Sequence, residues 1–114
     1  RRRPFMRGKP NSTENISFDG FVSAYVKGNK PGFADVGSQA GFMKGQPNGT
    51  TITHYFRYED QPRLQAFLNE RLDINLTLTR ENVSPPMELA LTADVESRLR
   101  RKCAEEFDLY ASIP

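Results

Sequence analysis

Residues 51–64, TITHYFRYEDQPRL, contain a strand signal that runs directly into a helix signal. Ile52 to Tyr58 is rich in β-branched and aromatic side chains, which pack well on a pleated sheet. Asp60 can then cap a helix through its side-chain oxygen, and Pro62 falls in the first turn, where a missing N–H is harmless. A strand that leads abruptly into a helix is half of a βαβ unit, so the sequence predicts an α/β fold.

The predicted helix over residues 60–72 is amphipathic. One further helix is expected before it in the sequence and one after it. Ser17 can cap the first, whose apolar residues form one stripe and which Gly28 closes. Thr92 can cap the last helix, which ends in apolar anchors. The apolar positions of the three helices are Leu64, Phe67, Leu68 and Leu72; Phe18, Phe21, Val22, Tyr25 and Val26; and Val95, Leu99, Cys103 and Phe107, followed by Leu109, Tyr110 and Ile113.

The segments between these helices give weaker signals. Residues 33–43 are ambiguous, with Asp35 as a candidate cap for a short helix that Gly37 and Gly41 weaken. Residues 73–78 alternate apolar and polar side chains, which is typical of a short extended segment. We therefore expect the chain to be mostly helical, with one or two short strands.

Length and charge limit the possible classes of protein. A chain of 114 residues can form one modest core, as a domain or part of one. The 16 basic and 14 acidic side chains nearly balance, which argues against a protein that mainly coats nucleic acid. Five basic residues precede the first acidic one, Glu14, and form either a solvated arm or an anion-binding surface: Arg1, Arg2, Arg3, Arg7 and Lys9.

The chain carries one cysteine, so an internal disulfide and a cysteine metal cluster are excluded. No apolar run approaches the roughly 20 residues that cross a bilayer, and no signal peptide is visible. The chain opens inside an arginine run without Met, so we expect it to be a piece of something longer. Five sequons permit glycosylation, but we favour their ordinary role in turns and caps: Asn11, Asn15, Asn48, Asn75 and Asn82.

The usual catalytic residue types do not form a recognisable set. His54 is the only histidine and has no second ligand at metal spacing, so a structural imidazole is expected. Cys103 falls on the apolar face of its helix and is expected to be a small core residue rather than a nucleophile. Glu59 and Asp60 stand at the end of the predicted strand, where α/β sites collect. Asp60 is accounted for as a cap and Glu59 can be the partner of a neighbouring arginine, so the catalytic residues stay unassigned.

The most suggestive polar group is formed by Arg80, Asn82 and Ser84. A guanidinium, an amide and a hydroxyl lie here on a loop that Pro85 and Pro86 stiffen. This combination suits an anionic group such as a phosphate, together with the edge of a base. Ordinary turn chemistry is the alternative interpretation of the same three residues.

Several segments, taken in order, resemble the C-terminal half of a bacterial, carbohydrate-type family-2 sulfotransferase. That family shows an aromatic-Arg-aromatic-Glu strand end, an Asn-x-Ser loop and a terminal helix that ends Phe-x-Leu-Tyr. Gln39 is similar to a glutamine that the family often places ahead of the strand. The matching segments span nearly all 114 residues: Arg3-Pro4-Phe5, Gly8-Lys9-Pro10, Ser17 to Val22, Ser38-Gln39-Ala40, Tyr55 to Asp60, Arg80 to Pro85 and Cys103 to Tyr110.

The resemblance implies a fold like that of the P-loop-containing nucleoside triphosphate hydrolases, with residues 1–114 as the C-terminal portion of a single sulfotransferase domain. Such enzymes transfer a sulfuryl group from 3′-phosphoadenylyl sulfate (PAPS) to a hydroxyl or amine acceptor, often on a carbohydrate. The resemblance also implies that Arg80, Asn82 and Ser84 bind this nucleotide co-substrate and that Gln39 binds the acceptor. It implies no metal and no nucleic acid as partner, and it leaves the oligomeric state open.

The family's N-terminal phosphosulfate-binding loop is absent from this sequence, and the segment that grips the 3′-phosphate is expected just upstream of Arg1. The isolated chain is therefore not expected to catalyse transfer. The resemblance implies a cytoplasmic bacterial enzyme, or the Golgi lumen if the source is eukaryotic. The alternative is a non-catalytic helical binding module that holds an acidic partner through its basic N-terminal arm.

Overall fold

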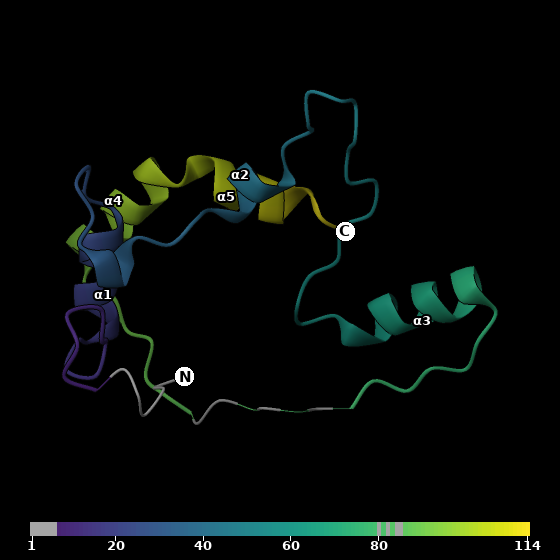
Figure 1. The fold of residues 1–114 in the computed structure, drawn as a ribbon, viewed down its shortest axis with the longest axis horizontal. Helices are drawn as coiled ribbons and strands as arrows, with labels where there is room; N and C mark the ends of the chain where they lie inside the picture. The colour runs from purple at the N-terminus through teal and green to yellow at the C-terminus, as the bar shows by residue number, and fades with distance from the viewer. Residues whose placement is uncertain (1–6, 80, 82, 84–85) are drawn as a thin grey trace.

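The computed structural model describes residues 7–79, 81, 83 and 86–114, and within them the regular structure is helical. Figure 1 shows the elements in an open arrangement, with α3 on an arm apart from the other helices. The expectation of a mostly helical chain is confirmed. The elements are α1 (Phe18–Tyr25), the 3-10 turn η2 (Gly32–Ala34), α2 (Gln39–Met43), α3 (Gln61–Leu72), α4 (Ala93–Lys102) and α5 (Ala104–Ser112).

Local capping signals set the start of three helices. The Ser17 hydroxyl accepts a hydrogen bond from the Gly20 N–H at 3.0 Å, and α1 begins at the next residue. The Asp60 carboxylate accepts from the Arg63 N–H at 3.3 Å at the start of α3. Both predicted caps are confirmed, as is Pro62 in the first turn. The cap predicted at Asp35 is wrong, because Ser38 caps α2 instead.

The predicted last helix is two helices. Thr92 precedes α4 as expected, but its side chain does not cap the helix. Its backbone N–H and its hydroxyl both donate to the Asp19 carboxylate of α1, at 2.7 and 3.0 Å, so the residue links two helices. At Cys103 the backbone leaves helical geometry, with φ −115° and ψ 29°, and this break separates α4 from α5.

The strand predicted at residues 52–58 is absent from the described part of the chain, and the short extended segment predicted at residues 73–78 belongs to no strand there either. The first segment has the composition of a strand, but no second segment among the described residues pairs with its backbone. A strand is stable only when neighbouring strands bond its N–H and C=O groups, which composition alone cannot provide. The described part of the chain is therefore helical rather than α/β, and the segment with a strand-like sequence is unpaired.

Side chains of α3 hold the second of these segments. The α3 helix ends at Leu72, and the left-handed φ of 50° at the next residue, Asp73, turns the chain back along the helix. The Asn69 side chain then accepts from the Leu76 N–H at 2.8 Å and donates to the Leu76 C=O at 3.3 Å. Gln65 accepts from the Leu78 N–H at 3.2 Å. The returning chain is thus bonded to a helix rather than to a strand.

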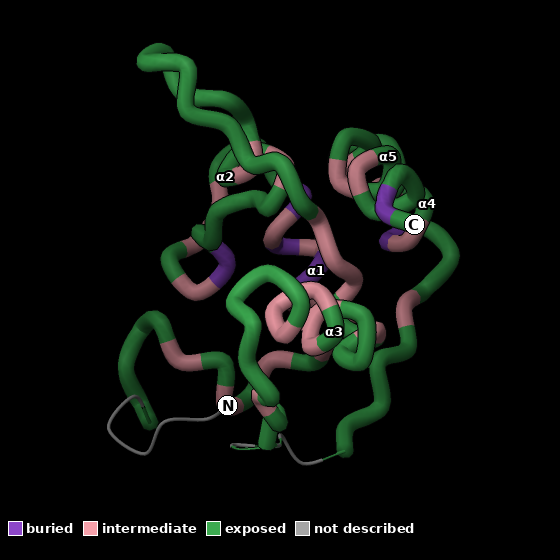
Figure 2. The backbone as a smooth tube through the Cα atoms, turned by 90° about the vertical axis from the view of Figure 1, so that its right-hand side faces the viewer, coloured by how far each residue is buried: buried purple, intermediate pink, exposed green. Residues whose placement is uncertain are grey.

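The buried core lies where α1 meets η2 and α4. Ala34 is fully buried, and Val95 of α4 is 4% exposed against the face of α1. The rings of Phe21 and Phe33 extend this contact, with centroids 6.3 Å apart. Figure 2 shows that buried residues are few and that the rest of the backbone is largely exposed or intermediate. The buried apolar residues are Val22, Ala24, Val26, Ala34, Val95 and Ile113.

The chain is more open than a packed domain of the same size. Its radius of gyration is 17.5 Å, against about 13 Å for a compact chain of this length. Its accessible surface is 9448 Å², and the usual scaling with mass gives about 6,300 Å². Large apolar side chains contribute to the difference: Phe42 is 78% exposed and Tyr58 is 88% exposed. The fold therefore leaves a large surface available for contact.

None of the helices in the described ranges is long and apolar enough to cross a membrane.

Candidate functional site

An open groove of about 810 Å³ forms where α2, the segment before α3 and the end of α5 meet. A groove of this size can hold a small molecule. It brings together two residues that the sequence singled out, Gln39 and Glu59. Its walls combine exposed aromatic side chains with a few polar groups, among them Gln39, Phe42, Met43, Tyr58, Glu59 and Tyr110.

Arg57 fastens the end of the chain to one wall of this groove. Its Nε donates to the Ile113 C=O at 2.9 Å and its Nη2 donates to the Tyr110 C=O at 3.4 Å. The guanidinium also lies over the Tyr110 ring, 4.6 Å from the centroid. A planar fork with several donors can bond two carbonyls and stack on an aromatic face at once. Arg57 thereby bonds two carbonyls at the C-terminal end of α5, of which that of Tyr110 also accepts the Ile113 N–H at 3.3 Å.

Glu59 makes its contact with Tyr110 rather than with an arginine. The Tyr110 hydroxyl donates a short hydrogen bond to the Glu59 carboxylate. This bond lowers the pKa of Glu59, with a smaller contribution from the charge of Arg57, and it raises the pKa of Tyr110. Near neutral pH the pair is therefore a carboxylate bonded to a protonated phenol. The sequence-based suggestion that Glu59 serves a neighbouring arginine describes only a secondary effect.

Gln39 is the first residue of α2 and is exposed at the groove. The short helix is held from the other end of the sequence, because both carboxylate oxygens of Glu106 lie 3.2 Å from the Ala40 N–H. A carboxylate is favourable at a helix N-terminus, where backbone N–H groups lack partners. Glu106 of α5 thus fixes the position of the predicted acceptor-binding residue.

The predicted nucleotide-binding residues Arg80, Asn82 and Ser84 lie outside the described residues, as do Arg1, Arg2 and Arg3. Their roles stay predictions. The last basic residues of the N-terminal arm are described, and Arg7 forms an exposed ion pair with Glu14 at 3.4 Å. Arg7 is thus already engaged within the chain.

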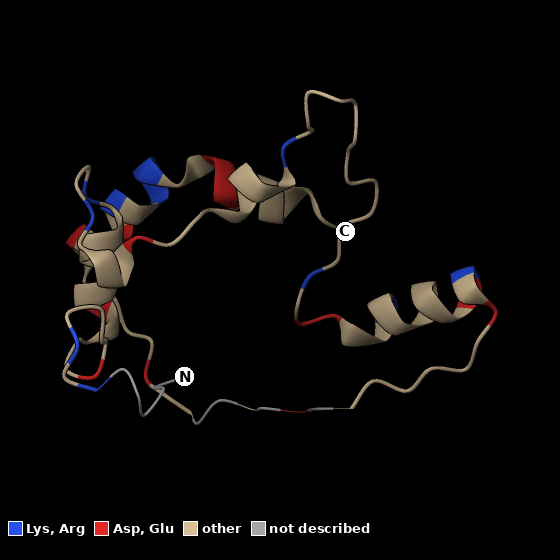
Figure 3. Cartoon of the chain, in the orientation of Figure 1, with Lys and Arg blue, Asp and Glu red and all other residues tan. Residues whose placement is uncertain are grey.

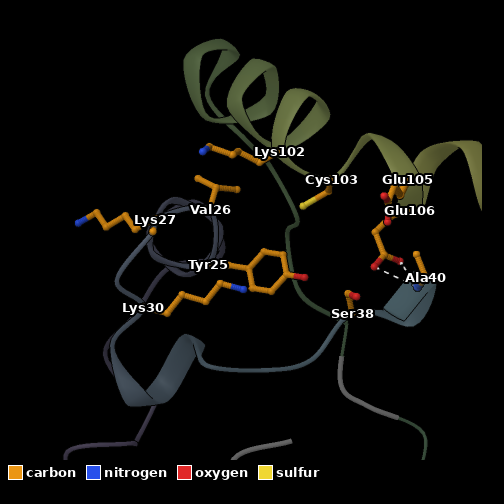
Figure 4. A pocket seen from close by; sticks show the side chains of 11 residues that line it. Tyr25, Val26, Lys27, Lys30, Ser38, Ala40, Lys102, Cys103, Glu105 and Glu106 are labelled. Carbon is orange, nitrogen blue, oxygen red and sulfur yellow. Dashed lines mark hydrogen bonds between the residues drawn. The ribbon is translucent and has the colours of Figure 1, made fainter. Parts of the chain in front are cut away.

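A second, smaller cavity of about 270 Å³ contains Cys103 (Figure 4). The thiol lies at the break between α4 and α5 and faces Tyr25 of α1, while the Lys30 ammonium lies 4.0 Å from the centroid of the Tyr25 ring. Burial, followed by the negative charge of Glu106, raises the pKa of the Cys103 thiol. A protonated, half-buried thiol is a poor nucleophile, which supports the expected packing role of Cys103.

His54 is exposed and contacts two neighbours. Its Nδ1 lies 2.8 Å from the Thr53 hydroxyl, and its ring lies 4.6 Å from the ring of Phe67 in α3. The imidazole therefore packs on a helix, in keeping with a structural role. Across the part of the chain that the structure describes, no three His, Cys, Asp or Glu side chains converge as metal ligands.

Many charged residues lie in the first and last turns of helices. Figure 3 shows basic residues along α4 and acidic residues at the start of α5. Arg100, Arg101 and Lys102 occupy the last turn of α4, and Glu105 and Glu106 the first turn of α5. Both placements favour the helix dipoles. This pattern accounts for many of the charges without invoking a ligand.

Two residues that build the groove had no polar role in the sequence interpretation. Tyr110 was expected only as an apolar anchor, and Glu106 had no assigned role. Both belong to the ending Cys103 to Tyr110 that carries part of the family resemblance, which was the one available signal. Comparison of the sequence and the structure with protein-family models, with curated proteins and with solved structures finds no match.

Proposed function

We propose that the chain is the C-terminal portion of a PAPS-dependent sulfotransferase with a P-loop-like fold. The observation that carries the proposal is the network of Arg57, Glu59 and Tyr110. Two of the segments on which the family resemblance rests, Tyr55 to Asp60 and Cys103 to Tyr110, lie some 50 residues apart in sequence and are bonded to each other through these three side chains. Because the two segments bond each other, a protein family that keeps one of them has a physical reason to keep the other.

The proposed enzyme moves a sulfuryl group in line from PAPS to an acceptor hydroxyl or amine, with carbohydrate as the favoured acceptor. The bond from sulfur to the bridging phosphate oxygen breaks as the bond to the acceptor forms, and a base takes the acceptor proton. As in phosphoryl transfer, the protein contributes mainly positioning and positive charge near the departing oxygen. The base is not assigned to any residue of this chain.

Within this proposal the chain supplies two surfaces. Arg80, Asn82 and Ser84 provide a guanidinium, an amide and a hydroxyl, a donor set suited to a phosphate and a base edge. Gln39 provides an amide in the groove beside exposed aromatic side chains. An amide beside an aromatic face suits a sugar, which offers hydroxyls at its edge and C–H groups on its faces.

The nucleotide assignment is tested on the full-length protein that contains this chain. We expect adenosine 3′,5′-bisphosphate to raise its melting temperature and the Arg80→Ala variant to bind the nucleotide less tightly by about 1–3 kcal/mol, or about 5- to 150-fold. Arg101→Ala, which removes an exposed arginine of α4, is the matched control and should bind normally. The absence of both a thermal shift and sulfuryl transfer would overturn the proposal.

The acceptor assignment has a separate test. Gln39→Ala in the full-length protein should raise KM for the acceptor while leaving the affinity for adenosine 3′,5′-bisphosphate unchanged. If the full-length protein instead captures an acidic partner in a salt-sensitive way, and capture survives the loss of Arg80, Asn82 and Ser84, the binding-module alternative is the better description.

A further inference from the structure

The groove formed by α2, the segment before α3 and the end of α5 contains a carboxylate that is oriented but not neutralised. Glu59 is exposed at this groove, and the Tyr110 hydroxyl donates to its Oε1. The phenol is uncharged, so it fixes the carboxylate without cancelling the negative charge. A carboxylate has about four acceptor positions, so Glu59 can also accept hydrogen bonds from a ligand. The groove therefore offers one oriented negative charge to a bound molecule.

The other charged side chains at the groove bond the backbone of the chain itself. Among the described residues that line the groove, these are Arg57 and Glu106. Arg57 donates to two carbonyls at the end of α5, and both carboxylate oxygens of Glu106 lie 3.2 Å from an N–H at the start of α2. The described lining thus carries two carboxylates and one guanidinium. With His54 neutral its net charge is negative, which favours a cationic ligand over an anionic one.

Exposed aromatic rings stand beside this carboxylate. Tyr58, the residue before Glu59, and Phe42 of α2 both line the groove and are both largely exposed. The face of an aromatic ring attracts a cation, and the groove already contains one such pair, because the Arg57 guanidinium lies over the Tyr110 ring. In the part of the chain that the structure describes, no Lys or Arg lies over the ring of Tyr58 or Phe42. These two rings are therefore open to a cation from a ligand.

A carboxylate beside open aromatic faces is a combination that recognises an organic ammonium ion. An exposed ion pair alone contributes little, so the aromatic contact adds to what Glu59 provides. Gln39 lines the same groove, and its amide can both donate to and accept from hydroxyls. An amino sugar offers all the matching groups: an ammonium, several hydroxyls and C–H groups on the faces of its ring.

We propose that the groove binds an amino sugar, whose protonated amine is held by the Glu59 carboxylate against the open faces of Tyr58 and Phe42. This inference rests on the proposed function in one respect, because it names the class of acceptor that the enzyme takes. The binding itself involves only side chains of the described groove. Glu59 is here a residue that selects the ligand by charge, and it has no part in the transfer step.

Three methyl glycosides of similar size and different charge test the inference on the full-length protein that contains this chain. They are methyl β-glucosaminide, which is cationic, methyl β-glucoside, which is neutral, and methyl β-glucuronide, which is anionic. NMR titration near neutral pH gives the dissociation constant of each. We expect the glucosaminide to bind about 10-fold more tightly than the glucoside. The glucuronide should bind least tightly of the three.

Variants then assign the preference to particular side chains. Glu59→Gln keeps the shape of the side chain and removes its charge, so the glucosaminide should lose its advantage over the glucoside. Asp108→Asn is the matched control, since it removes an exposed carboxylate of α5 that does not line the groove, and it should keep the advantage. Tyr58→Ala should reduce the advantage, whereas Tyr58→Phe keeps the aromatic face and should preserve it.

The results separate this inference from the proposed function. Equal affinity for the glucosaminide and the glucoside, or an advantage that survives in Glu59→Gln, would overturn the amino-sugar site even if sulfuryl transfer from PAPS were found. An advantage that depends on Glu59, in a protein with neither nucleotide binding nor transfer, would support the site and overturn the sulfotransferase assignment. Tightest binding of the glucuronide would overturn the inference in favour of an anionic ligand. Butylamine binding as tightly as the glucosaminide would overturn the sugar as the ligand, because the groove would then recognise the ammonium alone.

Discussion

The region around α1 and the arm that carries α3 are both helical, yet they are stabilised in different ways. In the first, α1 packs on η2 and α4 and buries Val22, Ala34 and Val95 almost completely. In the second, no residue of α3 is buried, and the helix is held by aromatic contacts and by side-chain hydrogen bonds. The caps of the two helices are nevertheless of the same kind.

This difference between the two regions shows that the start of a helix and the burial of its apolar face have separate causes. Local signals such as Ser17 and Asp60 decide where a helix begins, and they work in both regions. Burial of an apolar face depends on a partner, and α1 has one within the described chain whereas α3 does not. Most helical stability in proteins comes from packing rather than from propensity. We therefore expect the two helices to respond differently to equivalent substitutions.

The largest effect is expected in the packed region. Val95→Ala removes two methyl groups from a site that is 4% exposed and should lower the free energy of unfolding by about 2 kcal/mol. The matched change in the arm, Leu72→Ala, affects a side chain that is 58% exposed and should cost less than about 0.5 kcal/mol. Urea unfolding followed by circular dichroism measures both. Equal losses would remove the distinction between the two regions.

The next effect concerns the contact between the segment before α3 and the C-terminal end of α5. Arg57→Ala removes the bonds to the Ile113 and Tyr110 carbonyls and should lower stability by about 1–2 kcal/mol. Arg57→Lys keeps the charge but not the fork, so it should restore only part of the loss. Amide exchange around Ile113 should rise in parallel. Arg101→Ala is the control, and a loss as large as that of Arg57→Ala would mean that charge rather than geometry is responsible.

The caps give a smaller effect of similar size in both regions. Ser17→Ala and Asp60→Ala should each cost about 1 kcal/mol. Carbon chemical shifts should show fraying of the first turn of α3 in Asp60→Ala, because no buried face holds that helix. The first turn of α1 should persist in Ser17→Ala, since its packing remains. Asp60→Asn keeps the acceptor and should restore α3; fraying of both helices to the same extent would contradict the comparison.

The smallest effect is a pH dependence. The hydrogen bond from Tyr110 lowers the pKa of Glu59 below its ordinary value of 4.5. The contact therefore contributes stability that is fully present above pH 4.5 and is lost as pH falls through the lowered pKa. The raised pKa of Tyr110 means that its contribution is present below the ordinary value of 10.0 and is lost as pH rises further.

An NMR titration of the Glu59 carboxyl tests this. Tyr110→Phe should return the pKa of Glu59 toward its ordinary value, while Ser112→Ala, whose hydroxyl bonds the Leu109 carbonyl, should leave it unchanged. A Glu59 pKa that is the same in the wild type and in Tyr110→Phe would show that the hydroxyl does not govern the carboxylate.

The sequence predicted those features that depend on neighbouring residues. The helices after Ser17 and Asp60 follow from caps and apolar spacing, and both are present. The strand at residues 52–58 was wrong for the described chain because pairing is a long-range property that composition does not supply. The break at Cys103 was missed because Val95, Leu99, Cys103 and Phe107 keep helical spacing across it.

The candidate site was likewise predicted only in part from the sequence. Gln39 was singled out from a resemblance, and it lines the same groove as Glu59. The contacts that build that groove join residues 51 to 66 positions apart, such as Glu106 with Ala40, and no local sequence pattern predicts them. Arg80, Asn82 and Ser84 lie outside the described residues, so their part in the site remains a prediction from sequence.

The double hydrogen bond between the Asn69 side chain and Leu76 has a consequence for recognition. The Asn69 side-chain amide donates and accepts one hydrogen bond each, as a backbone peptide group does in a sheet. The helix and the chain that returns along it are therefore held together as one hairpin. A partner that binds α3 would therefore also have residues 74–78 next to it. Substituting Asn69 would release these residues and separate two surfaces that otherwise arrive together.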